Sequence, residues 1–244
     1  MADKFWYFVM VPMVYLSAAW CVVWLAVKVT AILHAPKLPH TVRIFPEDKG
    51  PDDPAAAPLV GAIIDSFTMP SVKRYQPCFW WFLILFHGAL LLLLVSHLDV
   101  LPQINLMSSD SPHMIGNGAV GVLVTVALLY FLFRRFRTPV REVSVPGDYL
   151  MVLLLLCIAV SGDMISWGNS WAEGGFGMTK QDFGTYMESL IRFTFSEPQQ
   201  VLHGGHLPVI GTHVLLVNLF LLLLPFSKLV HFLFAVPLNK LRRG

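Results

Sequence analysis

The last apolar span of the chain, residues 207–237, contains two histidines and constrains the possible fold more than any other feature. His213 and His231 are eighteen residues apart. In a continuous helix with about 3.6 residues per turn and about 1.5 Å rise per residue, they would lie on one face roughly 27 Å apart. A bilayer hydrocarbon core is about 30 Å thick. A second span, residues 79–101, carries His87 and His97, about 15 Å apart along a helix axis. We therefore expect two membrane helices that carry four histidines.

The composition indicates a membrane protein. Of the 244 residues, 56% are hydrophobic and only 13% are charged, whereas roughly a quarter of the residues in soluble domains are charged. A helix that crosses a hydrocarbon core needs about 20 apolar residues. Five runs reach this length, the first being too long for a signal-peptide core: residues 5–33, 79–101, 115–136, 149–167 and 207–234. The sequence predicts an all-α integral membrane five-helix bundle that forms a single domain over residues 1–244.

The distribution of lysine and arginine predicts the orientation of this bundle. Thirteen of these residues lie in the first and third connections, at the end of the third span, and in or after the last span. Only three, Lys4, Lys180 and Arg192, lie on the opposite side. Because cytoplasmic loops are enriched in lysine and arginine, we expect the amino terminus outside and the carboxyl terminus in the cytoplasm.

Three connecting segments have features of their own. Residues 50–58 are rich in proline and are typical of a linker, which is either a docking surface or a plain tether. Residues 59–67 are predicted to form a short interfacial helix. Residues 179–194 place Phe183, Met187, Leu190, Ile191 and Thr194 on one face, which predicts a helix on the outer membrane surface.

The depth of the four histidines predicts how they pair. The second span runs outward and the fifth runs inward, so each residue of one has a partner at equal depth on the other. Pairing His87 with His231 and His97 with His213 leaves each pair within about 6 Å of a common depth, whereas the crossed pairing would separate the partners by about 21 Å. The sequence therefore predicts two sites, one near each membrane face.

Paired imidazoles between helices suit a haem iron. A lone histidine inside a membrane either serves function or forms a hydrogen bond with a neighbouring helix. Two imidazoles that face each other can ligate the iron of a porphyrin, whereas zinc or copper needs more protein ligands. No Cys-x-x-Cys-His motif occurs, so a haem here would be non-covalent.

Two glycines and a proline lie close to the histidines. Gly88 and Gly211 either let a flat macrocycle approach the backbone or serve ordinary helix packing. Pro225 is expected to bend the last helix before His231.

A short block of sequence resembles a known family. Residues 224–231 read Leu-Pro-Phe-Ser-Lys-Leu-Val-His, Thr212 precedes His213, and ten residues separate His87 from His97. This pattern resembles the gamma subunit of respiratory nitrate reductase. The resemblance implies a five-helix dihaem cytochrome b in a prokaryotic cytoplasmic (inner) membrane, with the inner haem iron between His87 and His231 and the outer haem iron between His97 and His213. The long first connection is similar to the branch found in sulfite-reduction-associated, high-molecular-weight cytochrome and heterodisulfide-reductase-like membrane complexes.

The resemblance also implies a function. We expect two haem b groups that transfer electrons between a quinone pool (menaquinone or ubiquinone) near the outer face and a cytoplasmic iron-sulfur partner. An alternative is a quinone-independent anchor and conduit that receives electrons from an outer multihaem cytochrome c. A transporter is a weaker third reading, because no inverted repeat is visible. The connecting segments are too small for substrate chemistry, so the chain would be an electron-transfer subunit of an oxidoreductase complex. Nothing in the sequence resembles a nucleic-acid-binding surface.

Five polar residues are candidates for quinone or proton contacts near the outer face. The simpler reading is that the acidic residues are solvated helix ends and that Gly204-Gly205 marks a turn. The candidates are Asp99, His113, Asp163, His203 and His206.

Overall fold

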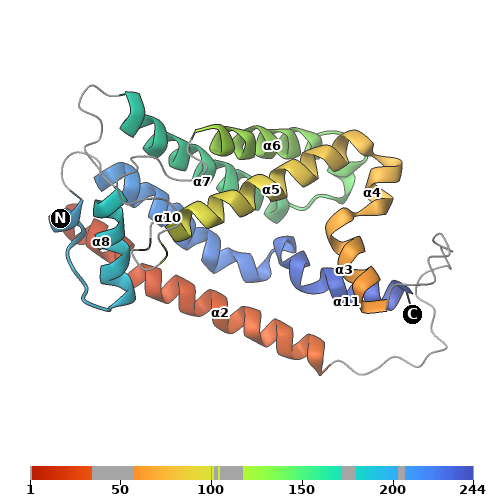
Figure 1. Ribbon diagram of the computed structural model, residues 1–244, viewed down its shortest axis with the longest axis horizontal. Helices are drawn as coiled ribbons and strands as arrows, with labels where there is room; N and C mark the ends of the chain where they lie inside the picture. The colour runs from red at the N-terminus through yellow and green to blue at the C-terminus, as the bar shows by residue number, and fades with distance from the viewer. Residues whose placement is uncertain are drawn as a thin grey trace.

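A computed structural model describes residues 2–34, 58–99, 101, 104, 118–171, 180–202 and 207–243 (Figure 1). All regular secondary structure in these residues is helical. The elements are α1 (Ala2–Met10), α2 (Pro12–Leu33), α3 (Pro58–Thr68), α4 (Pro70–Tyr75), α5 (Pro77–Asp99), α6 (Ala119–Arg135), η1 (Val140–Val143), α7 (Pro146–Trp171), α8 (Lys180–Ile191), α9 (Pro198–Val201), α10 (Leu207–Leu223), η2 (Leu224–Phe226), η3 (Lys228–Val230) and α11 (His231–Arg243).

Four helical runs among the described residues are long and apolar enough to cross a membrane. They are Asp3–Leu33, Pro77–Asp99, Pro146–Ser166 and Leu207–Phe226. Between 11% and 33% of each apolar window is buried inside the structure, so most of these side chains face outward, as lipid contact requires. The chain is therefore a multi-pass membrane protein. The remaining predicted span, residues 115–136, corresponds to α6, which has 17 residues.

The long helices lie side by side along the longest axis of the molecule. Helix α6 packs against α5 and α7, and α10 packs against α7 and α2 (Figure 1). Helices α1 and α11 lie at opposite ends of this arrangement, so the first and last described helices mark its two ends (Figure 1). One group of buried apolar side chains lies between α5, α6 and α7: Ala89, Val124, Leu128 and Val152.

The predicted first span is two helices. Helix α1 ends at Met10 and α2 begins at Pro12, which has no backbone N–H to continue the helical hydrogen bonds. The side-chain amide of Asn218 donates to the carbonyl of Val9 over 2.9 Å, and the Tyr186 hydroxyl donates to the carbonyl of Met10 over 2.6 Å. These bonds tie the break to α10 and α8, and Val9, Met10 and Val11 are almost completely buried there.

The predicted single helix over residues 207–234 is wrong. Helix α10 ends at Leu223, two short 3-10 turns follow with Ser227 extended between them, and α11 begins at His231. Pro225 lies in the first turn and is buried, which confirms the predicted bend. The Ser227 hydroxyl accepts a hydrogen bond from the backbone N–H of Leu229 over 3.2 Å. Helical periodicity therefore cannot be carried from His213 to His231.

The two predicted short helices are present. Helix α3 packs against α11, and the Asn239 amide donates to the Ser66 hydroxyl over 2.9 Å. Helix α8 buries Tyr186 and Leu190 against α1 and α10. Ile191, which we expected on the apolar face of a surface helix, is exposed, whereas Tyr186, which was not among the expected residues, is buried.

Candidate functional site

His87 and His231 lie next to each other near the end of the bundle where α11 is found. Their ring centres are 6.3 Å apart, and the ring planes are nearly perpendicular, at 89°. His87 is in the middle of α5, whereas His231 is the first residue of α11, immediately after the break. The break therefore decides the direction in which the His231 imidazole leaves the backbone.

His97 and His213 form a second pair closer to the other end. His97 lies in the last turns of α5 and His213 in the first half of α10. Their imidazoles are close enough to interact electrostatically. The structure thus places His87 beside His231 and leaves His97 within electrostatic range of His213, in the combinations that the depth argument predicts.

Each of the four imidazoles is hydrogen-bonded through Nδ1. The Nδ1 atoms of His87 and His97 donate to the carbonyls of Leu83 and Leu93, both over 2.7 Å, and that of His231 donates to the Lys228 carbonyl over 3.3 Å. These assignments are fixed because a carbonyl can only accept. In a neutral imidazole with a proton on Nδ1, Nε2 keeps a lone pair for a metal.

The fourth imidazole, His213, is held from a neighbouring helix. Its Nδ1 lies 2.9 Å from the hydroxyl oxygen of Ser161 on α7. When that hydroxyl donates its proton to the Ile158 carbonyl over 2.9 Å, its oxygen accepts from Nδ1 of His213, in the tautomer that leaves Nε2 free. His34, outside either pair, makes a similar bond to the Thr30 carbonyl over 2.8 Å. The Nδ1 bond alone therefore identifies no ligand, and the pairing is the distinguishing feature.

The geometry of the His87–His231 pair fits one metal ion between two axial ligands. Metal–imidazole bonds are about 2 Å long, so ring centres on opposite sides of one ion lie about 6 Å apart, close to the observed 6.3 Å. Within the described residues, no group of three or more histidine, cysteine or acidic side chains is arranged to hold a bare metal ion. A porphyrin iron needs only two ligands from the protein, so the separation of the His87 and His231 rings is compatible with a haem iron between them.

The two glycines singled out in the sequence have different surroundings in the structure. A Cβ atom on Gly88 would meet nothing within 4 Å, so the backbone beside His87 is open. A Cβ atom on Gly211 would collide with the Trp6 indole, so this glycine serves helix packing and not the approach of a macrocycle. Gly162, which the sequence reading missed, would place a Cβ 3.4 Å from Cε1 of His213. Its signal in the sequence was only a small residue in an apolar run.

The acidic candidates are buried, so the reading as solvated helix ends is wrong for both. Asp99 is completely buried at the end of α5. Asp163 is 7% exposed, and its carboxylate accepts a hydrogen bond from the Thr125 hydroxyl of α6 over 2.8 Å. Gly121 gives this carboxylate room, because a Cβ there would collide with it. His113, His203 and His206 lie outside the described residues.

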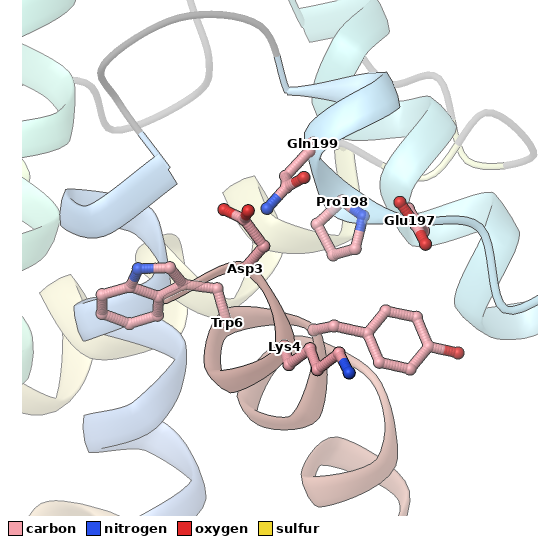
Figure 2. Close-up of a pocket in the computed structure, with 7 residues that line it drawn as sticks. Asp3, Lys4, Trp6, Glu197, Pro198 and Gln199 are labelled. Carbon is pink, nitrogen blue, oxygen red and sulfur yellow. The ribbon is translucent and has the colours of Figure 1, made fainter. Parts of the chain in front are cut away.

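A cavity of about 310 Å³ lies between α1 and the region of α9 (Figure 2). Asp3, Lys4, Trp6 and Tyr7 line it from α1, and residues 197–199 line it from the other side. Trp6 also packs on Gly211, two residues before His213. Two residues rotate a helix by about 200°, so Trp6 and the His213 side chain lie on opposite sides of α10. The cavity is therefore separate from the histidine pairs.

Comparison with known proteins assigns the family. Residues 75–244 match the nitrate reductase gamma subunit family. The chain belongs to this family. The match includes all four paired histidines and helices α5, α6, α7, α10 and α11, whereas α1, α2 and α3 precede it.

One protein to which this chain is similar is the "Hdr-like menaquinol oxidoreductase cytochrome b-like subunit" of Archaeoglobus fulgidus. It is 31% identical over 165 residues, which cover 62% of this chain and 46% of the relative. This chain thus spans about half the length of that protein. Both comparisons confirm the resemblance inferred from the sequence, including the heterodisulfide-reductase-like branch.

Proposed function

We propose that this chain is the dihaem b-type cytochrome subunit of a membrane menaquinol oxidoreductase complex. The observation that supports this most directly is the His87–His231 pair, with ring centres 6.3 Å apart and each Nδ1 bonded to a backbone carbonyl. Family membership and the name of the Archaeoglobus fulgidus relative support a cytochrome b-like role and menaquinol as the quinone.

The chain's own residues divide into two haem sites. His87 and His231 would hold the inner haem through Nε2, and His97 and His213 would hold the outer one. A haem supplies a one-electron couple between ferric and ferrous iron, whose potential depends on its axial ligands and their hydrogen bonds. The Nδ1 bonds fix the tautomer and the orientation of each imidazole and increase its basicity.

The proposed topology is a single domain of five spans. Helix α6 is the third span in chain order and adds to the four long apolar runs described above. Lys73, Arg74, Arg134, Arg135 and Lys228 all lie in α4, at the end of α6 or in η3. These elements are near the end of the molecule that holds α11 (Figure 1). The positive-inside rule makes this end cytoplasmic and the end with α1 and α8 external, in a prokaryotic cytoplasmic membrane.

We place quinol oxidation at the external end of the molecule, near His97 and His213. Oxidation of one menaquinol releases two electrons and two protons. The electrons leave toward the cytoplasmic end and a partner iron-sulfur subunit, and the protons are released outside. Asp99, Asp163, His113, His203 and His206 remain our candidates for contacts with the quinone or its protons. Electron transfer across the membrane in this direction conserves about 2.3 kcal/mol per charge at 100 mV.

Purified complex tests this proposal by two measurements. Extraction into acidified organic solvent should give two non-covalent haems per chain, and a soluble menaquinol analogue should reduce them. A count of zero or one haem would contradict the dihaem assignment. If quinol fails to reduce the haems while a reduced multihaem cytochrome c does so, the chain is a quinone-independent conduit.

A further inference from the structure

Helix α7 carries none of the four paired histidines, yet it is linked by hydrogen bonds to one histidine of each pair. It supplies the partner of His213 directly, and it binds the residue whose carbonyl is the partner of His231. At one position, Ser161 accepts directly from Nδ1 of His213. At another, Asp148 binds Lys228, whose carbonyl accepts from Nδ1 of His231. Thirteen residues separate Ser161 from Asp148, or about 20 Å along a helix, so the two contacts lie at different depths of the bundle.

The Asp148 contact is strongly constrained. Its side chain is 7% exposed, and Oδ2 accepts from Lys228 Nζ over 2.6 Å and from the Val145 N–H over 3.1 Å. Nη1 of Arg135 lies 3.9 Å from the same oxygen. A buried carboxylate with three cationic or N–H neighbours is costly to displace, because removing one partner leaves buried charge uncompensated. Lys228 therefore has a buried partner at its ammonium group, even though its own side chain is 66% exposed.

The contact between Lys228 and Asp148 affects the break before His231, because Lys228 lies within that break. It begins η3, directly after the extended Ser227, and η3 leads into His231. This break lacks the regular helical hydrogen bonds that would otherwise set the direction of the chain. The ion pair joins it to the start of α7, and the Lys228 carbonyl in turn contacts the His231 imidazole.

We propose that Ser161 and Asp148 are positioning residues, through which α7 orients and tunes the His213 and His231 ligands independently. This inference rests on the proposed haem function. Ser161 acts directly on the outer ligand, and Asp148 acts through Lys228 on the inner one. Hydrogen bonds to the second ring nitrogen make an imidazole a better ligand for ferric iron, so their loss should favour the ferrous form.

Redox titration of the full-length protein in its purified complex tests the inference. The two haems are first assigned from the one lost in His97→Ala and the one lost in His87→Ala. Ser161→Ala should raise the midpoint potential of the outer haem only, and Asp148→Asn should alter that of the inner haem only. Loss of such contacts typically changes metal affinity about tenfold or more, and a tenfold change is about 59 mV for one electron.

Conservative variants separate positioning from a general effect on folding. Ser161→Thr keeps the hydroxyl and should restore the outer potential. Ser144→Ala, at a hydroxyl that bonds only within its own turn to Val140, should leave both potentials unchanged. If Asp148→Asn does not accumulate, Lys228→Gln tests the same link and leaves Asp148 with its Val145 and Arg135 contacts.

The outcomes distinguish this inference from the proposed function. Unchanged potentials in Ser161→Ala and in Asp148→Asn or Lys228→Gln, with both haems retained, would overturn the positioning role of α7. Equal shifts of both haems in every variant would overturn it as well. A wild-type complex without haem would instead overturn the proposed function itself.

Discussion

The ring centres of the His87 and His231 imidazoles are 6.3 Å apart and their planes are nearly perpendicular, although His87 lies within a continuous helix and His231 begins a new one. Helix α5 fixes His87 by regular backbone hydrogen bonds. His231 depends on the preceding break, on Pro225 and on the ion pair between Lys228 and Asp148. The two ligands of one proposed site are thus held by different physical means.

Substitution of single histidines should remove haems in matched pairs. His87→Ala and His231→Ala should each lose the same haem, because these rings lie together, and His97→Ala and His213→Ala should each lose the other one. Haem-to-protein ratios and optical spectra of the purified variants measure this. His34→Ala is the control, since His34 makes the same kind of Nδ1 bond outside either pair, and it should keep both haems. Loss of the same haem from His87→Ala and His213→Ala would contradict the pairing.

The two glycines near the histidines should respond differently to added side-chain volume. Gly211→Ala should destabilise the protein by about 1–3 kcal/mol, because its Cβ would collide with Trp6. Gly88→Ala meets nothing within 4 Å and should leave the thermal midpoint of the protein nearly unchanged. Thermal unfolding in detergent, followed by circular dichroism, compares the two. Equal midpoints would show that Trp6 moves aside without cost.

Loss of the Thr125 hydroxyl should destabilise the α6–α7 contact. Thr125→Val removes the donor to the buried Asp163 carboxylate, which should cost about 1–3 kcal/mol. Thr30→Val is the matched control, because that hydroxyl is exposed and bonds only to Val27 in its own helix. Thermal unfolding measures both variants. If Thr125→Val also slows haem reduction by quinol while haem content is unchanged, Asp163 acts in the quinone reaction and not only in packing.

Tyr186 should make stability fall at alkaline pH. Burial raises the pKa of its hydroxyl above the ordinary value near 10, with Tyr15 adding to the effect. The unfolded chain therefore ionises first, so the stabilisation is complete below about pH 10 and decreases as the pH rises toward the folded-state pKa. Tyr186→Phe should weaken this dependence and lose about 1 kcal/mol at neutral pH, because the bond to the Met10 carbonyl is removed. Tyr75→Phe, at an exposed position, should change neither the pH dependence nor the stability at neutral pH. Thermal midpoints at pH 7 to 11 provide the comparison.

The sequence alone determined that the chain is a helical membrane protein with two pairs of histidines. Apolar run length reports membrane crossing directly, because a hydrocarbon core has a fixed thickness and backbone groups in it must bond within a helix. Depth follows from residue number at about 1.5 Å per residue, so the partners of His87 and His97 could be inferred without knowledge of helix packing. The motif around His231 also indicated the family correctly.

Tertiary structure decided which other side chains serve these histidines. The use of Gly211 by Trp6 and the burial of Asp99 and Asp163 depend on how packed helices are rotated about their axes. Periodicity describes one helix at a time and carries no information on that rotation. Ser161 meets His213, and Asp148 meets Lys228, across 52 and 80 residues of chain, and such contacts form only when the bundle closes.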